Sequence, residues 1–446
     1  MTKARWRSEG RDQLRLGVHL VRWIVLGAAS GALAGASSWL FLQGLDRVTR
    51  YRLGHGWLVY LLPLAGLAVA SAYHAFGGRS GQGNALLIDQ IHDPTEWVPR
   101  RMAPLVLVGT WVTHLFGGSA GREGTALQMS GGLSDGLARV LRLDGDDRRL
   151  LLVAALAGGF GAVFGVPLAG AVFAMEVQSI GRVRYEAIVP ALTAAVTGDL
   201  VVDGLGYHHA VLAKLDIPVD VWLLARIALA GLAFGLAGAF FAELTHGVRA
   251  VAGRAVPWPP ARAAAGGAGL IGLALLFGRQ YLGLSLPLVD PALAGAHVGW
   301  WVFALKIVFT AVTLGCGFPG GEVTPLFVIG ATLGGTLAPV LHLDPGALAA
   351  IGFVAVFAGA ANVPLACTIM GAELFGGGTI VAMAVGCVVA YVFSSHRGIY
   401  ATQRIDAAKG PEPIEGRPTV AAWARRGERA AHTTVTVGRA RGGKGR

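Results

Sequence analysis

Charged residues are scarce in this chain. Asp, Glu, Lys and Arg make up 14% of its 446 residues, whereas 54% are hydrophobic and 67 are glycine. This composition excludes an ordinary soluble domain of this length and indicates a polytopic, all-α membrane protein. Apolar runs of membrane-spanning length lie at 17–42, 55–76, 221–242 and 262–278, while other runs are too short to cross about 30 Å of hydrocarbon.

Cysteine is rarer still, and no set of residues has the spacing of a metal site. Cys316, Cys367 and Cys387 all stand in apolar surroundings, so neither a disulfide framework nor a metal or cofactor site is predicted. An intramembrane enzyme would need a nucleophile or metal ligands beside Glu123 and Glu322, and none has that spacing. The pattern therefore argues against an enzyme. No role is assigned to His114, Glu243 and His246.

The net charge of +11 is concentrated at the two ends of the chain. Basic residues dominate segments 1–16 and 401–446, which predicts that both termini are cytosolic. We expect the tail to be solvated and to face anionic lipid, because nothing beyond its charge favours nucleic acid. The interior divides into a first membrane repeat at 17–205, a connecting loop at 206–220 and a second repeat at 221–400. The first apolar run is too long for a cleaved signal peptide.

An internal repeat relates the two halves. "FGVPLAGAVFAME" ends at Glu176 and "ANVPLACTIMGAE" ends at Glu373, and in both a glutamate follows the proline by nine positions. These two acids are interpreted as structural residues at span ends. Upstream of each copy lies a glycine-rich turn, "GGSAGREGTALQMSGG" and "LGCGFPGGEVTPLFVIGATLGG". We align the first turn with the second as follows: Gly121 with Gly317, and Gly124 with Gly320.

Glycine-rich turns at membrane depth predict helices that begin inside the membrane. Such helix starts carry unpaired N–H groups and a partial positive charge, and they are tolerated where they line a cavity. A third turn, "GGRSGQGNALLIDQIHD", places Asn84 at the start of another short helix. Two halves with broken helices at corresponding positions are typical of a transporter with a midplane site, so three helix starts are predicted to converge on one anion.

Several polar residues near these turns are candidates for the site. Glu123, in the first turn of a half-helix, would compete with an anion for the same N–H groups and so act as a tethered gate; the alternative is a simple capping acid. Thr324 and Asn84 offer donors to an anion, or act only as N-caps. Glu322 either caps its helix or lies along a proton or anion route. Lys306 either raises the local anion concentration or snorkels.

The order of "GxGN", "GREG", "VPLAG...E", "GGxxxP" and a late tyrosine resembles the CLC family of anion channels and proton-coupled exchangers, over roughly residues 20–405. The resemblance implies the CLC fold, which is a homodimer with one pore per subunit, built from two inverted repeats of tilted and broken helices. It implies gating and proton coupling at Glu123. It also places the tyrosine, otherwise an interfacial residue, in the inner pore. The implied anion-binding residues are Asn84, Gly121, Arg122, Gly124, Val323, Thr324 and Tyr400. Since only about forty residues, mostly polar and basic, follow the last span, we expect no pair of CBS domains, which many members carry.

Departures from the chloride-type pattern resemble the bacterial subclass that exports fluoride in exchange for protons. Thr125 replaces a proline, "GQGNALLIDQIHDP" replaces a serine turn, and "GGEVTPLF" replaces a phenylalanine-bearing turn. Val177 stands where a second, proton-relaying glutamate would follow, and Ala85 and Ile88 occupy positions expected to be aromatic. The resemblance implies a fluoride/proton antiporter of the bacterial inner membrane that confers fluoride resistance. A chloride channel or chloride/proton exchanger is the alternative.

Overall fold

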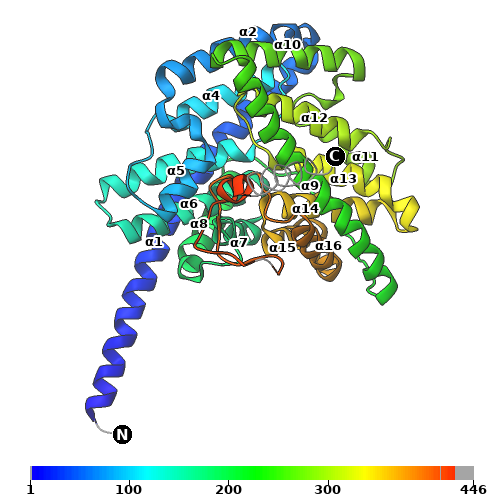
Figure 1. The fold of residues 1–446 in the computed structure, drawn as a ribbon. Coiled ribbons are helices and arrows are strands. Elements are labelled where there is room, and N and C mark those ends of the chain that lie inside the picture. The colour runs from blue at the N-terminus through cyan, green and yellow to red at the C-terminus, as the bar shows by residue number, and fades with distance from the viewer. Residues whose placement is uncertain (1–2, 412, 427–446) are drawn as a thin grey trace, which may run out of the picture.

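The structure, a computed structural model, describes the backbone of residues 3–411 and 413–426, and side chains from residue 12 onward. Helices dominate it (Figure 1). Those of the first half are α1 (Lys3–Gly54), α2 (Leu62–Ala72), α3 (Asn84–His92), α4 (Met102–Leu115), α5 (Glu123–Val140), α6 (Gly145–Phe164), α7 (Pro167–Glu176) and α8 (Ile188–Gly204). Those of the second half are α9 (Val221–Ala255), α10 (Pro259–Phe277), α11 (Val289–Leu293), α12 (Val302–Gly315), α13 (Val323–Leu341), α14 (Pro345–Ala361), α15 (Pro364–Phe375) and α16 (Ile380–Phe393).

Helix length separates two kinds of element. Six helical stretches of the described chain are long and apolar enough to cross a membrane: Asp12–Gly54, Gly56–His92, Tyr185–Gly204, Val221–Ala255, Pro259–Phe277 and Val323–Leu341. The other apolar helices, such as α4, α7, α12 and α15, have 10 to 17 residues and need neighbours to complete a crossing. Buried apolar residues from both halves form one continuous core cluster around α6, α13 and α14.

The two halves repeat one another element by element. Helices α4 to α7 correspond to α12 to α15, and α5 and α13 begin at Glu123 and Val323, which are 200 positions apart. Gly117 and Gly317 have φ values of +93° and +99°, a conformation that favours glycine. The sequence alignment of Gly121 with Gly317 and of Gly124 with Gly320 is therefore wrong by four residues. The error arose because each turn contains several glycines, and only the backbone conformation distinguishes them.

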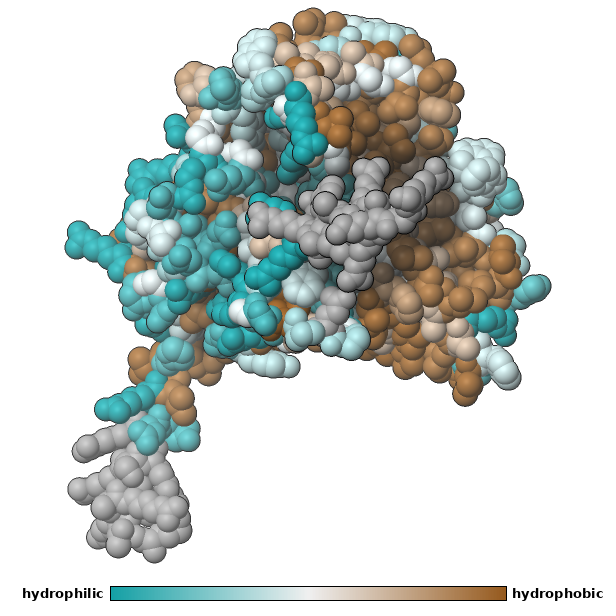
Figure 2. All heavy atoms as spheres, in the orientation of Figure 1, coloured by the Kyte–Doolittle hydropathy of each residue, from teal (hydrophilic) through white to brown (hydrophobic). Residues whose placement is uncertain are grey.

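The surface carries a broad apolar region over α9 and α16 (Figure 2). Its exposed side chains include Trp222, Leu229, Phe240, Val388 and Val392. Water would penalise such exposure, whereas lipid or another apolar surface would not. The N-terminal part of α1 stands apart from the other helices as a rod (Figure 1), so residues 3–16 of the basic segment and the first span share one helix.

The segment after α16 folds back on the helices. Strand β2 (Arg404–Ile405) pairs in parallel with β1 (Ser179–Ile180), which follows α7. The Gln403 amide donates to the carbonyls of Val177 (2.8 Å) and Ala361 (3.1 Å), one in each half. Residues 403–405 therefore dock on the helices, which the sequence did not predict, while most of the other described tail residues are exposed or half-exposed and residues 427–446 lie outside the described residues.

Candidate functional site

The two glycine-rich turns meet back to back. Gly121 and Gly321 form an isolated antiparallel bridge in which each N–H donates to the carbonyl of the other, at 2.7 and 2.9 Å. The bridge brings together the N-termini of α5 and α13, one from each repeat. Two sets of unpaired N–H groups, each at the positive end of a helix, therefore face one small region.

The Glu123 side chain lies in this region and bonds to the helix of the opposite repeat. Its carboxylate accepts hydrogen bonds from Val323 N at 2.6 Å, Thr324 N at 3.2 Å and Thr324 Oγ1 at 3.1 Å. A fourth bond comes from Arg122 N at 3.0 Å. Glu123 is 1% exposed. The carboxylate thus occupies donors that a free anion would use, and it caps α13 as well as its own turn.

Gly321 provides the space for this carboxylate. A β-carbon added at Gly321 would lie 1.8 Å from Glu123 Oε1 and 2.3 Å from Cδ. Any residue with a side chain here would exclude the observed position of Glu123. Glycine is therefore needed at position 321 to leave room for the Glu123 carboxylate, whatever backbone conformation the turn requires.

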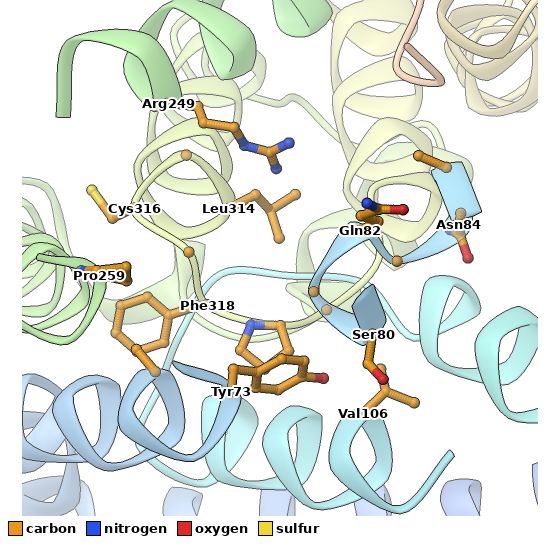
Figure 3. Close-up of a pocket in the computed structure, with 18 of the residues that line it drawn as sticks. Tyr73, Ser80, Gln82, Asn84, Val106, Arg249, Pro259, Leu314, Cys316 and Phe318 are labelled. Atoms are coloured by element: carbon orange, nitrogen blue, oxygen red, sulfur yellow. The ribbon is translucent and has the colours of Figure 1, made fainter. Parts of the chain in front are cut away.

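A cavity of about 560 Å³ lies beside the two helix starts (Figure 3). Arg249 enters it from α9, and Gln82 and Asn84 line it from the turn before α3 and from the start of that helix. Tyr400 and Glu322 also line it. The third predicted helix start thus lies beside the other two, and a β-carbon added at Gly124 would be 3.4 Å from the Asn84 amide nitrogen.

The other predicted residues differ in whether they line the cavity. Arg122 contributes its N–H to Glu123, but its guanidinium lies over the Phe164 ring, 5.4 Å from the centroid, and does not line the cavity. Val323 is buried and offers its N–H. Tyr400, 4% exposed, is a cavity residue as the resemblance implies. Ala85 lines the cavity, whereas Ile88 packs in the core.

The structure bears on the alternative roles predicted for Glu322 and for Lys306. Glu322 is the N-cap residue of α13, yet its side chain makes no capping hydrogen bond, and it faces the cavity with Arg249. Lys306 does not snorkel, because it is 0% exposed. His246, which has no role in the sequence-based prediction, lines the cavity and contacts Gly398 O at 3.1 Å. Within residues 12–411 and 413–426, no group of three or more His, Cys, Asp and Glu side chains is placed to hold a metal ion.

Each of the two acids of the repeat motif forms hydrogen bonds with the opposite half of the chain. Glu176, at the end of α7, accepts from the N–H groups that begin α15, Leu365 (3.1 Å) and Ala366 (2.9 Å). Glu373 accepts in the same way from the start of α7. Each carboxylate therefore caps the helix of the other repeat, which agrees with a structural role for both.

Comparison with known proteins places this arrangement in a family. The family model described as "Voltage gated chloride channel" matches residues 65–395. The chain belongs to the CLC family of anion channels and exchangers. A "Chloride/fluoride channel protein" from Pseudomonas syringae pv. tomato is 47% identical over 414 residues, covering 90% of this chain and 91% of that protein. An "H(+)/Cl(-) exchange transporter" from Cronobacter sakazakii is 28% identical, covering 77% and 79%.

Solved CLC structures share the fold. The crystal structure of a "CLC-type fluoride/proton antiporter" matches with a TM-score of 0.84 and 34% identity, covering 87% of this chain and 98% of that one. A cyanobacterial Cl⁻/H⁺ antiporter matches with a TM-score of 0.74 at 20% identity, which reports on the fold alone. The chain is thus a multi-pass membrane protein of the CLC fold, in a family of anion transporters and channels and not of enzymes.

Proposed function

We propose that this protein exports fluoride from the bacterial cytosol in exchange for protons, and so confers fluoride resistance. The observation that carries the proposal is the Glu123 carboxylate on the Val323 and Thr324 donors. Fluoride, like a carboxylate oxygen, is a small and strongly hydrated acceptor, so its dehydration needs strong compensating donors. The similarity to a CLC-type fluoride/proton antiporter supports the same assignment.

The exchange follows from competition for one set of donors. When ionised, Glu123 holds the start of α13. When protonated, its acceptor strength falls, and fluoride takes the N–H groups and the Thr324 hydroxyl. Each departure of the acid therefore moves a proton, and each return displaces an anion. Val177 is buried and apolar, so no second acid follows Glu176, and proton coupling runs through Glu123.

The working unit is proposed to be a homodimer in the bacterial inner membrane, with one pathway per subunit and both termini cytosolic. The apolar surface over α9 and α16 supports contact with lipid. The basic residues at the two ends support the orientation, because cytosolic segments carry an excess of Lys and Arg.

Efflux from liposomes tests the proposal. Vesicles loaded with fluoride or chloride are diluted into halide-free buffer, with and without an imposed proton gradient, while halide and proton movements are recorded. We expect proton-coupled fluoride efflux and little chloride efflux. Chloride that moves as fast as fluoride would refute fluoride selectivity and favour the chloride channel or exchanger. Fluoride efflux that moves no protons would refute the exchange.

Thr324→Val tests the donor role while keeping the side-chain shape. Loss of one hydrogen bond to a charged acceptor costs about 1.5–3 kcal/mol, so we expect a roughly 10- to 100-fold loss of fluoride transport. Chloride efflux should change less, because chloride holds its water less tightly. Thr324→Ser keeps the hydroxyl and serves as the matched control. Equal fluoride transport in the Val and Ser variants would contradict the donor role.

A further inference from the structure

A second cavity, of about 310 Å³, lies at the opposite end of α9 from the cavity beside Glu123. The last residues of the connecting loop, the first two turns of α9 and the turn between α13 and α14 line it. Ile227 of α9 lines this cavity and His246 lines the other, and these residues are roughly 30 Å apart along the helix axis. No residue lines both, so this cavity is separate from the transport pathway.

The floor of this cavity is apolar and its rim is acidic. The buried residues that form the floor are Ile217, Ile227, Leu348 and Ile351. The charged residues that line the cavity are exposed, and they are Asp216, Asp220 and Asp344. A ligand that matches both parts carries an apolar chain and a positive charge.

The three acids keep carboxylate oxygens free for such a charge. Asp220 Oδ1 accepts from two N–H groups in the first turn of α9, at 2.8 and 3.0 Å, and Asp344 Oδ1 accepts from Ala347 N at 2.7 Å. Among the described residues, the second oxygen of each acid and the whole Asp216 carboxylate have no hydrogen bond or ion pair. The three acids do not converge on a metal position either, since no such group exists in residues 12–411 and 413–426.

The cations closest in sequence do not neutralise these acids. Lys214 Nζ donates to the carbonyls that end α15, at 3.0 and 3.2 Å. Arg226 Nη1 donates to His342 O at 3.0 Å. Because His342 precedes Leu343, a lining residue, the Arg226 guanidinium lies at the rim of the cavity. The rim therefore offers one cation beside three anions, which matches a zwitterionic group.

The cavity opens where two membrane-length stretches end. Helix α9 begins at Val221, and the stretch Val323–Leu341 ends just before Leu343. Beside the cavity, Trp222 is 76% exposed and Val340 is 72% exposed. Tryptophan is enriched at the membrane–water interface, and large exposed apolar side chains are favourable where lipid covers them. Phospholipids therefore have direct access to the cavity.

We propose that this cavity binds phosphatidylethanolamine, a phospholipid whose headgroup carries a primary ammonium. An acyl chain fills the apolar floor, the ammonium donates to the free oxygens at the rim, and the phosphate accepts from Arg226. A choline headgroup has no N–H to donate, and a glycerol headgroup leaves the lipid with a net negative charge beside three acids. The inference does not depend on which anion the protein transports, because no lining residue belongs to that pathway.

Native mass spectrometry of the full-length protein, purified in detergent, tests the inference. The probes are phosphatidylethanolamine, phosphatidylcholine and phosphatidylglycerol with identical acyl chains, and the first binding step is compared. We expect phosphatidylethanolamine to bind about five- to tenfold more tightly than phosphatidylcholine, the size expected for a few exposed charge pairs. Phosphatidylglycerol should bind more weakly than either.

Variants of the rim and the floor separate charge from shape. The triple variant Asp216→Asn, Asp220→Asn and Asp344→Asn removes the charges but keeps acceptors for the two helix caps, so the preference for phosphatidylethanolamine should disappear. Ala347→Phe fills the cavity and should weaken binding of both zwitterionic lipids without changing their ratio. Asp290→Asn is the matched control, because it removes an exposed acid that does not line the cavity.

Each outcome decides the inference. Equal binding of the two zwitterionic lipids to the native protein, or a preference that survives in the triple variant, would overturn it. Tighter binding of phosphatidylglycerol would also overturn it, because the basic group would then select the lipid. Unchanged binding to Ala347→Phe would exclude this cavity as the site of the chain. If the triple variant aggregates, Asp216→Asn, which caps no helix, is titrated instead, and an undiminished preference there counts against the inference.

Discussion

The substitution Gly321→Ala tests the position of the gating acid most directly. The added β-carbon would lie 1.8 Å from Glu123 Oε1, 2.3 Å from Cδ and 2.7 Å from Oε2. Non-bonded β-carbons do not approach heavy atoms closer than about 3 Å, so the carboxylate has to retreat by roughly 1 Å or more. Its bonds to Val323 N (2.6 Å) and Thr324 N (3.2 Å) would then exceed hydrogen-bonding distance.

The size of the effect follows from those bonds. A hydrogen bond to a charged group contributes about 1.5–3 kcal/mol, so the loss of two favours departure of Glu123 by about 3–6 kcal/mol, at least 100-fold in the equilibrium. We expect fluoride efflux from Gly321→Ala liposomes to proceed without a proton gradient, and the number of protons moved per fluoride to fall.

The control places the same methyl group in open space. A β-carbon at Gly272 in α10 meets nothing within 4 Å, so Gly272→Ala should transport like the native protein. A crystal structure of Gly321→Ala should show Glu123 away from α13. Unchanged proton coupling together with an unmoved carboxylate would refute the reasoning.

Three further predictions concern the gate, the repeat and the tail. Glu123→Gln should abolish proton movement during fluoride efflux, because the glutamine amide neither takes up nor releases a proton. Glu373→Ala should lower the unfolding free energy by about 1–3 kcal/mol, measured by denaturation in detergent, because the N–H groups of Leu168 and Ala169 lose their acceptor. Burial lowers the pKa of Lys409 to about 6, below its value in the unfolded chain, so docking of the tail should weaken as the pH falls toward 6 and tryptic cleavage after α16 should accelerate.

Each of these predictions has a control. Glu123→Asp keeps an ionisable group, so full loss of coupling there as well would implicate side-chain length instead of charge. Glu186→Ala removes a half-exposed acid and should change stability little. Lys409→Met should reduce the pH dependence of cleavage. A Lys409→Met profile identical to that of the native protein would contradict the role of Lys409.

Much of the site was predictable because its chemistry is local in the sequence. The motifs "GREG" and "GGEVTP" show directly the glycines that precede each helix start. They also show the acid in the first turn of one helix and the hydroxyl in the first turn of the other. The predicted gate Glu123 and the predicted anion donor Thr324 are joined by a 3.1 Å hydrogen bond, which the sequence did not predict. Arg249 was missed, since it lies in the long helix α9 with no motif around it and reaches the cavity only by tertiary packing.

Other outcomes depended on pairing between distant segments. The sequence showed that Glu176 and Glu373 occupy equivalent positions, but not that each caps the helix start of the opposite repeat. It identified Lys306 but not its acceptors Gly283 O and Ser285 Oγ, because they belong to another segment of the chain. The tail carries no apolar periodicity, so its strand pairing with residues 179–180 was not expected.

By itself, the sequence determined the membrane environment, the two repeats and the residue types at the broken helices, because hydropathy and helix starts depend on neighbours along the chain. The tertiary structure alone decided which donors the Glu123 carboxylate occupies and which turns face each other through Gly121 and Gly321. Hydrogen bonds and buried charge depend on distance in space, and the inverted packing of two halves brings together groups that lie 200 positions apart.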